Sequence, residues 1–276
     1  MISSDDPRLQ DRNALALDLA EAARLGAQVL LRMRHARDVR VKADGSPVCS
    51  ADIAADEAAK AALDRLLPGF PVVSEESVDA VAASAVFILL DPLDGTREFL
   101  ADGDSYCVAI AIIRDGRPIA GAIAAPQLGQ LWYAGTEAFS QALGPDCERE
   151  GPARAAIVRP LPPGGPVTLV SRFHGDALSD RVAAAMQSSA TMPVSSAVKF
   201  GLIATGEADL HIRAGQTMEW DIAAGDAILT AAGGVVLTLD GKLPAYGRSD
   251  RGYRNPPFLA ASSDDLARKA LAVPRD

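Results

Sequence analysis

One stretch combines a buried strand with a cluster of polar groups: Phe87-Ile88-Leu89-Leu90-Asp91-Pro92-Leu93-Asp94-Gly95-Thr96-Arg97-Glu98-Phe99. Its apolar start suits a buried strand, which ends at two aspartates three residues apart. Carboxylates at the end of a buried strand lose hydration, so they need a cation or hydrogen-bond donors in compensation. Pro92 forces a turn, and the Leu93 carbonyl can then face the same side as both carboxylates. Three oxygen ligands within four residues predict a site for a hard cation.

The two residues after this turn, Gly95 and Thr96, predict an anion site beside the cation site. Gly95 permits a positive φ or a close backbone approach, and Thr96 can begin a helix whose free amides attract an anion. Metal and phosphate would then meet at one point. The alternative is an ordinary type I turn, in which aspartate is common. The apolar run before Asp91 makes the turn the weaker interpretation.

The composition of the 276-residue chain, 49% hydrophobic and 5% aromatic, indicates a soluble α/β or α+β protein of one large or two ordinary domains. No apolar run approaches the roughly 20 residues of a membrane helix. The N-terminus lacks the basic and apolar segments of a signal peptide. We therefore expect a cytoplasmic protein, and peripheral attachment at the inner face of the membrane stays open.

The net charge of -9 argues against nucleic-acid or acidic-membrane binding, because a uniformly negative surface repels both. A small anionic substrate is still compatible, since bound divalent cations would reverse the local field. Cys49, Cys107 and Cys147 are odd in number and lack CxxC spacing, so they indicate neither a disulfide framework nor a zinc site. We expect buried free thiols.

The start of the chain predicts helices over 11–36 and 53–67, separated by a polar hairpin or loop over 39–48. A short strand over 70–73 then leads to Glu75, a second place where an acid follows a strand. A solvated side chain is the usual meaning of such a glutamate, but its place after a buried strand favours a ligand.

The middle of the chain predicts an antiparallel meander, followed by a boundary between domains 1–160 and 161–276. The meander consists of three apolar runs with tight turns, at 106–113, 118–125 and 131–134. From residue 141 to 166 the pattern turns to glycine, proline and charge, which is typical of a linker.

The last part of the chain predicts a sheet with both faces covered, because strands and helices alternate. The expected order is strand 167–170, helix 178–187, strand 192–194, helix 197–204, strand 210–213, helix 221–232, strand 235–239, and a strand and a helix from Phe258.

Several polar residues near these element ends have more than one interpretation. From its own segment, Asp52 is interpreted as a helix N-cap, and Asp221 is either a cap or dipole partner of its helix or a functional acid. His174 follows a strand where α/β sheets bind ligands, although such a histidine is often structural. Ser196 and Lys199, three apart on one helical face, suit a phosphate site or a simple cap and surface lysine.

Three motifs, in this order, resemble those of the inositol monophosphatase superfamily of magnesium-dependent, lithium-sensitive phosphatases: Glu75-Glu76, Asp91-Pro92-Leu93-Asp94-Gly95-Thr96 and Trp220-Asp221-Ile222-Ala223-Ala224-Gly225. The resemblance covers about Leu15 to Ala261 and implies a layered α-β-α-β-α sandwich. The flanks are most similar to the CysQ-type 3'(2'),5'-bisphosphate nucleotidases: Arg97-Glu98-Phe99, Ser171-Arg172-Phe173-His174, Ser196 with Lys199-Phe200, and Met218-Glu219-Trp220-Asp221.

The resemblance implies a role for each matching position. Two or three Mg²⁺ ions would be held by Glu75, Asp91, the Leu93 carbonyl, Asp94 and Asp221. Asp52 and Thr96 would orient and deprotonate the attacking water, with Glu75 as a further catalytic residue. The substrate would be bound by Leu93, Asp94, the Gly95 and Thr96 amides, His174, Ser196, Lys199, Arg213 and Asp221. The loop Lys42-Ala43-Asp44-Gly45 would be a mobile flap beside the metals.

The chemistry agrees with the resemblance, because four acidic side chains without His or Cys partners select Mg²⁺ over zinc. Bound ions can activate a water and neutralise the leaving oxygen, which needs no covalent phosphoenzyme. Two positions depart from the family pattern. Cys49 stands where relatives often have threonine, and Glu137-Ala138 replaces a common Gly-Ala.

The expected activity is hydrolysis of the 3'-phosphate of adenosine 3',5'-bisphosphate (PAP), or of 3'-phosphoadenosine 5'-phosphosulfate (PAPS), to AMP or APS. Such an activity belongs to sulfur assimilation in this family. The alternatives are an inositol monophosphatase, a sugar (fructose-1,6-) bisphosphatase, or a non-catalytic regulator that binds nucleotide and metal. The sequence is compatible with a monomer or a homodimer.

Overall fold

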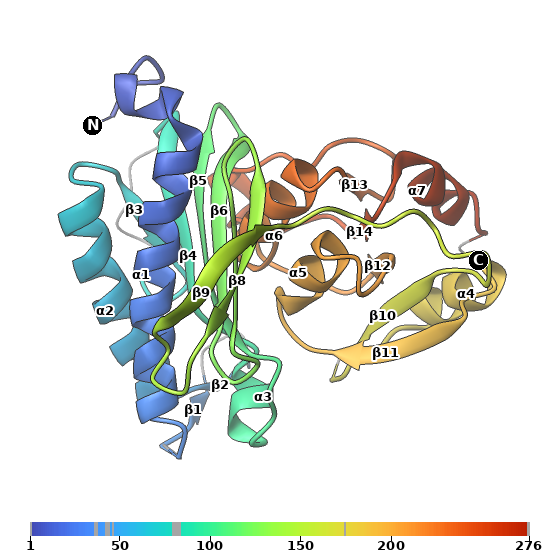
Figure 1. Cartoon of the computed structure of the whole chain (residues 1–276), viewed down its shortest axis with the longest axis horizontal. Coiled ribbons are helices and arrows are strands. Elements are labelled where there is room, and N and C mark those ends of the chain that lie inside the picture. Colours follow the sequence, from blue (N-terminus) through green and yellow to red (C-terminus); the bar gives the residue numbers. More distant parts are fainter. Residues whose placement is uncertain are drawn as a thin grey trace.

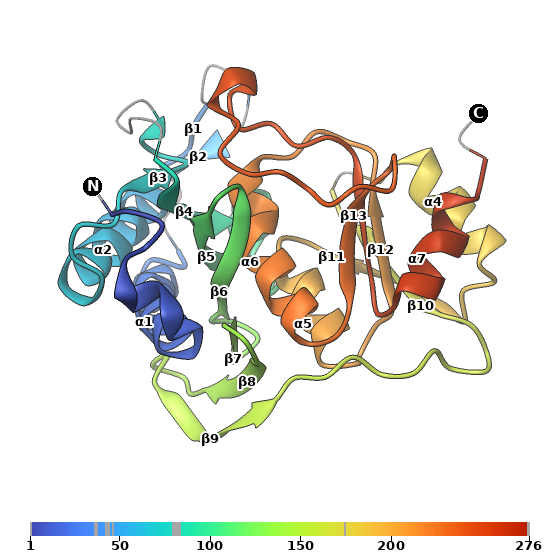
Figure 2. The same ribbon diagram turned by 90° about the horizontal axis from the view of Figure 1, so that it is seen from above.

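The structure is a computed structural model and describes residues 2–35, 38–41, 45, 47–78, 84–173 and 175–274. Helices and sheets alternate in layers across the molecule (Figure 1), and the same layers are visible from above (Figure 2). The predicted α-β-α-β-α sandwich is thereby confirmed. His174 and Lys42-Ala43-Asp44 of the predicted flap lie outside the described residues.

The first part of the chain forms the outer helical layer and a short hairpin. The helices are the 3-10 helix η1 (Pro7–Gln10), α1 (Arg12–Arg32) and α2 (Ser50–Leu66), and the hairpin strands are β1 (Arg40–Val41) and β2 (Pro47–Val48). β1 and β2 pair antiparallel, so the predicted hairpin is confirmed. Because α2 begins at Ser50, Asp52 is its third residue and Cys49 is the N-cap. The interpretation of Asp52 as an N-cap is therefore wrong.

The large sheet has seven strands in chain order. They are β3 (Val72–Ser74), β4 (Val86–Asp94), β5 (Cys107–Arg114), β6 (Arg117–Ala125), β7 (Gln130–Ala134), β8 (Ala138–Leu143) and β9 (Arg149–Ala155). β3 is parallel to β4 and every later pair is antiparallel, which confirms the predicted meander. The short helix α3 (Thr96–Leu100) follows β4 directly.

The large sheet is buried on both faces, which explains its apolar sequence. Along β4, Ile88 and Leu90 pack into the core beneath α1 and α2, whereas Phe87 and Leu89 pack into the core on the opposite face. Successive side chains of a strand point to opposite faces, so a strand covered on both sides is apolar throughout. Two buried faces thus hold the end of β4, and Asp91 with it, in one position.

The second half of the chain forms the remaining layers around a five-stranded sheet of order β11-β10-β12-β14-β13. Its elements are β10 (Val167–Ser171), α4 (Ala177–Ala185), β11 (Ala190–Val194), α5 (Val198–Ala204), β12 (Leu210–Arg213), α6 (Glu219–Ala231), β13 (Val235–Thr238), the 3-10 helix η3 (Ser249–Arg251), β14 (Phe258–Ala261) and α7 (Asp264–Leu271). Helices α5 and α6 lie between the two sheets, and α4 and α7 cover the outer face (Figure 2). The predicted alternation of strands and helices is confirmed.

The prediction for residues 141–166 is wrong in part, because β8 and β9 extend the meander into this segment. β9 is the exposed edge of the sheet and contains Gly151 and Pro152, which edge strands tolerate because one side needs no partner. The chain then crosses to the second sheet through residues 156–166. The division into domains 1–160 and 161–276 stays a prediction.

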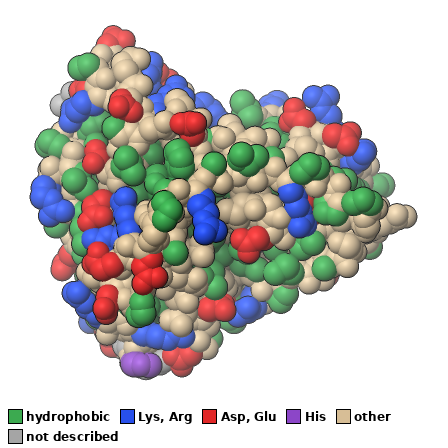
Figure 3. Space-filling model, viewed as in Figure 1, with side chains coloured by type: hydrophobic (Ala, Val, Ile, Leu, Met, Phe, Trp, Pro, Cys, Tyr) green, Lys and Arg blue, Asp and Glu red, His purple; other side chains and the backbone are tan. Residues whose placement is uncertain are grey.

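The surface over α1 and β9 carries acidic and basic side chains in close alternation (Figure 3). There Arg24 pairs with Glu21 and Glu148, and Arg149 lies 3.6 Å from Glu21. Over α1 and β9 the positive charge of these arginines is neutralised locally, which does not favour a polyanionic partner there. Among the described helices, none combines the length and the apolar character required to cross a bilayer.

Candidate active site

A cavity of about 740 Å³ lies where the end of β4 meets α5, β12 and α6. It is lined by almost all of the predicted site residues that the structure describes: Glu75, Asp91, Leu93, Asp94, Gly95, Thr96, Ser196, Lys199, Arg213 and Asp221. Asp52 is not part of the lining, but it contacts Thr96 from behind. Residues far apart in the chain therefore converge on one site.

The end of β4 is shaped by a β-bulge. Asp91 pairs with Ala109 and Asp94 with Cys107, so three steps along β4 match two along β5. The extra residue falls at Pro92-Leu93, where proline has no amide to donate to the sheet. The bulge turns the carboxylates of Asp91 and Asp94 toward the same cavity, as the sequence predicts. The predicted turn at Pro92 is wrong, because β4 continues through the bulge to Asp94.

Gly95 lets the chain turn directly from this strand into α3. Its φ is +94°, in the left-handed region, and it is the N-cap of α3. A Cβ at this position would lie 3.3 Å from the Tyr106 Cα and 3.4 Å from the Ser105 oxygen. The backbone therefore requires glycine, which agrees with the predicted positive φ.

Asp52 and Thr96 form a hydrogen-bonded pair behind the cavity. The Thr96 hydroxyl lies 3.2 Å from Asp52 Oδ1 and 3.2 Å from the Leu93 carbonyl oxygen. The other Asp52 oxygen accepts the Cys49 amide at 2.9 Å and the Cys49 thiol at 2.9 Å. Asp52 is 2% exposed, so its position is determined by these contacts.

The carboxylates of the cavity raise one another's pKa. Burial raises the pKa of Asp91 well above its usual range, and the charges of Glu75 and Asp94 raise it further. Burial also raises the pKa of Asp94 to about 6 and that of Asp221 well above the ordinary value. Such a cluster is unfavourable without a compensating positive charge.

Two cations from the second half of the chain face this cluster. Burial lowers the pKa of Lys199 to about 8, partly offset by Asp94, and burial also lowers the pKa of Arg213. Lys199 Nζ donates to the carbonyl oxygens of Ser196 at 2.7 Å and Val194 at 3.3 Å. Lys199 is only 7% exposed, so the alternative of a surface lysine is wrong.

Ser196 lies in the loop before α5, and not on the helix with Lys199 as predicted. Its φ is +58°, which is uncommon for a residue other than glycine. Helix α5 begins two residues later, at Val198, and the Ala197 amide donates to Asp94 Oδ2 at 2.5 Å. The strained loop thus links the second half of the chain to the β4 carboxylates.

Asp221 comes from the first turn of α6, and its Oδ2 accepts the Met218 amide at 2.8 Å. It is the third residue of the helix, in capping-box geometry with Met218. The cap interpretation and the functional interpretation are thus compatible, because the cap leaves the side chain at the cavity wall.

The family model described as "Inositol monophosphatase family" matches residues 11–272, almost the whole chain. The chain belongs to the inositol monophosphatase family. The 3'(2'),5'-bisphosphate nucleotidase CysQ of Salmonella typhimurium is 37% identical over 229 residues, covering 82% of this chain and 88% of that protein. The CysQ of Escherichia coli K12 is 37% identical over 224 residues, covering 80% and 87%.

Solved structures of this family share the fold. CysQ from Bacteroides thetaiotaomicron superposes with a TM-score of 0.77 at 27% identity, covering 93% of this chain and all of that one. The inositol monophosphatase from Anabaena has a TM-score of 0.71 at 21% identity, covering 95% and 97%. The predicted resemblance to the family, with CysQ proteins among its relatives, is confirmed.

The donor set of this family member fits a hard cation. Its cavity contains carboxylate and carbonyl oxygens, and burial raises the pKa of three of the carboxyl groups. Divalent cations bound by these oxygens would compensate the free-energy cost of burying the ionised carboxylates. Within the described ranges, no group of three or more Asp, Glu, His or Cys side chains is arranged to hold an ion as it stands. The ligand assignment is therefore a proposal.

The burial of two glutamates near the site, both within the matching flanks, was not predicted from the sequence. Glu98 is fully buried and links three segments: its oxygens lie 2.6 Å from Arg172 Nη1 and 2.7 Å from the Ser195 hydroxyl, and accept the Asp104 amide. Glu219 is also fully buried, beside Asp221. In the sequence, only their position next to the motifs distinguishes these glutamates, because the residue type does not show whether a glutamate is buried or exposed.

Proposed function

We propose that the protein is a Mg²⁺-dependent phosphatase that removes the 3'-phosphate of PAP, or of PAPS, giving AMP or APS and inorganic phosphate. The observation that carries this proposal is the buried acidic cluster opposed by Lys199 and Arg213 in one cavity. The relatives with 37% identity are named 3'(2'),5'-bisphosphate nucleotidases, which favours this substrate. A role in sulfur assimilation belongs to the same proposal.

The metal ligands in this proposal are Glu75, Asp91, the Leu93 carbonyl, Asp94 and Asp221, for two or three Mg²⁺ ions. Bound cations would supply a water of lowered pKa and would neutralise charge on the phosphoryl oxygens. Burial supports the assignment, because a carboxylate with a raised pKa gains most from a cation. Glu75 belongs to this set because its charge raises the pKa of Asp91.

Thr96 and Asp52 are proposed to accept the proton of the attacking water. The Thr96 hydroxyl can donate to Asp52 Oδ1, which leaves the lone pairs of Thr96 Oγ1 to accept a hydrogen bond from the water. A proton can then pass from the water to Thr96 Oγ1 while Asp52 Oδ1 takes the hydroxyl proton. Cys49 holds the second oxygen of Asp52 throughout.

Substrate binding is proposed for the remaining predicted residues. The Gly95 and Thr96 amides would hold the transferred phosphate, and Ser196, Lys199 and Arg213 would contact the nucleotide from the opposite wall. His174 belongs to the same group from its sequence position. Fixed positive charge near the leaving oxygen stabilises the transition state more than the ground state.

Phosphate release from PAP with and without Mg²⁺ tests the proposal. We expect Mg²⁺-dependent turnover, and kcat/KM for PAP well above the values for inositol 1-phosphate and fructose 1,6-bisphosphate at equal Mg²⁺. A preference for inositol phosphate would overturn the nucleotide assignment. Binding of Mg²⁺ and PAP without any phosphate release would favour the non-catalytic regulator.

Lithium provides a second test of the same chemistry. Members of this family are lithium-sensitive by the resemblance stated above, so we expect inhibition of PAP hydrolysis at low Li⁺ concentration. The control is an equal concentration of Na⁺. Equal effects of the two ions would count against a family-type metal site.

A further inference from the structure

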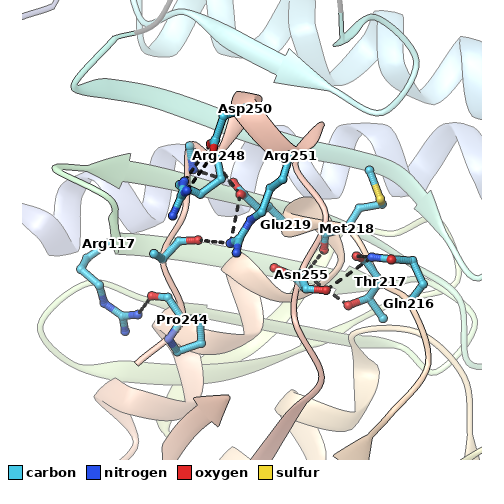
Figure 4. Close-up of polar contacts among 12 residues, drawn as sticks. Arg117, Gln216, Thr217, Met218, Glu219, Pro244, Arg248, Asp250, Arg251 and Asn255 are labelled. Carbon is cyan, nitrogen blue, oxygen red and sulfur yellow. Dashed lines mark hydrogen bonds and ion pairs between the residues drawn. The ribbon is translucent and has the colours of Figure 1, made fainter. Parts of the chain in front are cut away.

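The first turn of α6 is held by an unusual contact, a fully buried carboxylate at the first residue of the helix. Glu219 accepts the Gly247 amide at 2.5 Å and the Arg248 amide at 3.0 Å. Arg251 Nη2 lies 3.9 Å from Glu219 Oε1, whereas the Arg248 guanidinium binds Asp250 (Figure 4). A glutamate is almost never fully buried unless its charge is paired.

The same turn is also held through its backbone. The Glu219 amide donates to the Tyr253 carbonyl at 2.8 Å, and Met218 forms an antiparallel bridge with Arg254. Asn255 donates from its side chain to the Met218 carbonyl and to the Thr217 hydroxyl (Figure 4). Residues 216–219 thus pair with residues 253–255, immediately before Asp221.

The segment that holds α6 is itself attached to the large sheet. Arg117, at the start of β6, donates to the Pro244 carbonyl (Figure 4), and the Tyr246 amide donates to the Gly116 carbonyl at 3.1 Å. We define residues 244–255 as the clamp segment. It connects the sheet that contains Asp91 and Asp94 to the helix turn that contains Asp221.

We propose that Glu219 is a positioning residue for Asp221. By holding the clamp segment against α6, it fixes the backbone of Met218, whose amide donates to the Asp221 carboxylate. The distance from Asp221 to the β4 carboxylates then depends on Glu219, although Glu219 does not line the cavity. The proposal rests on the metal assignment made above.

Burial of a charge is the physical reason for assigning this role. A fully buried carboxylate costs free energy that an apolar residue would avoid, and its compensation is a fixed set of donors in one geometry. Glu219 obtains two amides and a guanidinium from the clamp segment, so any shift of α6 against that segment breaks contacts to a charge. Residues that orient ligands typically change metal affinity 10–100-fold when replaced.

The test compares Glu219→Gln with Asp209→Asn. Asp209 is a matched control because it is also a fully buried carboxylate held by a guanidinium and a backbone amide, those of Arg159 and Val167, and neither partner belongs to the clamp segment or the cavity. Mn²⁺ binding is measured by electron paramagnetic resonance without substrate, and Mg²⁺ activation is measured with PAP. We expect E219Q to weaken Mn²⁺ binding and to raise the half-activating Mg²⁺ concentration, each about tenfold. Maximal kcat should change less than about threefold, since the Asp221 side chain is retained.

For D209N we expect a lower Tm with unchanged Mn²⁺ binding. Equal losses of Tm in both variants, with Mn²⁺ affinity unchanged in both, would show that Glu219 is merely structural and would overturn the proposal. Should E219Q not fold, Arg251→Met removes one partner of Glu219, and normal Mn²⁺ binding in that variant would overturn the proposal instead. Mn²⁺ binding is measured without nucleotide, so the two proposals can fail separately. If E219Q weakens Mn²⁺ binding but the wild-type protein does not hydrolyse PAP, the proposed function is rejected and this inference stands.

Discussion

The two sides of the cavity hold their carboxylates in different ways. On the β4 side, Asp91 and Asp94 flank a bulge in a strand that is buried on both faces and paired with β5. On the α6 side, Asp221 lies on the first turn of a helix, and the clamp segment determines the position of that turn. The first side is held by sheet pairing between two apolar cores, whereas the first turn of α6 is held by polar contacts to a loop in addition to the apolar packing of Trp220 and Ile222.

The difference indicates which side can vary between conformations. Moving Asp91 would require breaking sheet hydrogen bonds and two apolar cores, whereas moving Asp221 requires breaking polar contacts to the clamp segment and disturbing one apolar core, at Trp220 and Ile222. Loop contacts generally open at lower free energy than sheet cores. Substitutions on the β4 side should therefore abolish chemistry, and substitutions on the α6 side should adjust metal affinity.

The largest effect is expected for Asp94→Asn, which breaks the β4 side. Asp94 lies at the end of the bulge, accepts the Ala197 amide and shares the cavity with Lys199. Loss of one ligand charge should reduce kcat for PAP by about 10³, in the range seen when a group that stabilises transition-state charge is removed. The measurement is phosphate release at saturating Mg²⁺, and circular dichroism checks the fold. Activity within tenfold of wild type would contradict the assignment of Asp94.

A smaller loss is expected for Thr96→Ala, which keeps every proposed metal ligand of the β4 side. The variant removes the hydroxyl between Asp52 and the Leu93 carbonyl. We expect kcat to fall by about 10², as for loss of general-base assistance, with Mn²⁺ binding unchanged. Thr96→Ser restores the hydroxyl and should recover most of the rate. Equal loss in both variants would show that packing of the methyl group matters, and not proton transfer.

The β4 side could be predicted from the sequence because its information is local. The apolar run to Leu90, the two aspartates and the glycine after them all lie within nine residues. Pro92 and Gly95 have few alternative backbone conformations, so an irregularity at Pro92 and the turn into α3 followed from residue type. The structure agrees at Gly95 and Thr96, but the irregularity at Pro92 is a bulge within β4 and not a turn.

The α6 side could be predicted only in part. The sequence places Asp221 in a first helical turn, but the partners of Glu219 are about 30 residues further along the chain. Whether a glutamate is buried depends on such distant contacts, and the same holds for Lys199 and Glu98. Strands β8 and β9 were missed for a related reason, since pairing with a neighbour and not residue type makes β9 a strand.

The smallest expected effect concerns the pH dependence of the metal-free protein. The pKa of Asp94 is about 6 in the fold, against 3.8 for the ordinary carboxyl. A group with a raised folded pKa stabilises the protein below its unfolded pKa, and that stability is lost as the pH rises through the folded pKa. Between pH 4 and 7.5 the loss from Asp94 is about 2 kcal/mol, or roughly 4–8 °C in Tm. The measurement is thermal unfolding in EDTA across this range.

Added Mg²⁺ should reverse the loss of stability above pH 6, and D94N should show a smaller slope of Tm against pH because asparagine does not titrate. An equal slope in D94N would mean that Asp94 is already compensated without metal, which would remove the electrostatic reason for a cation at the end of β4.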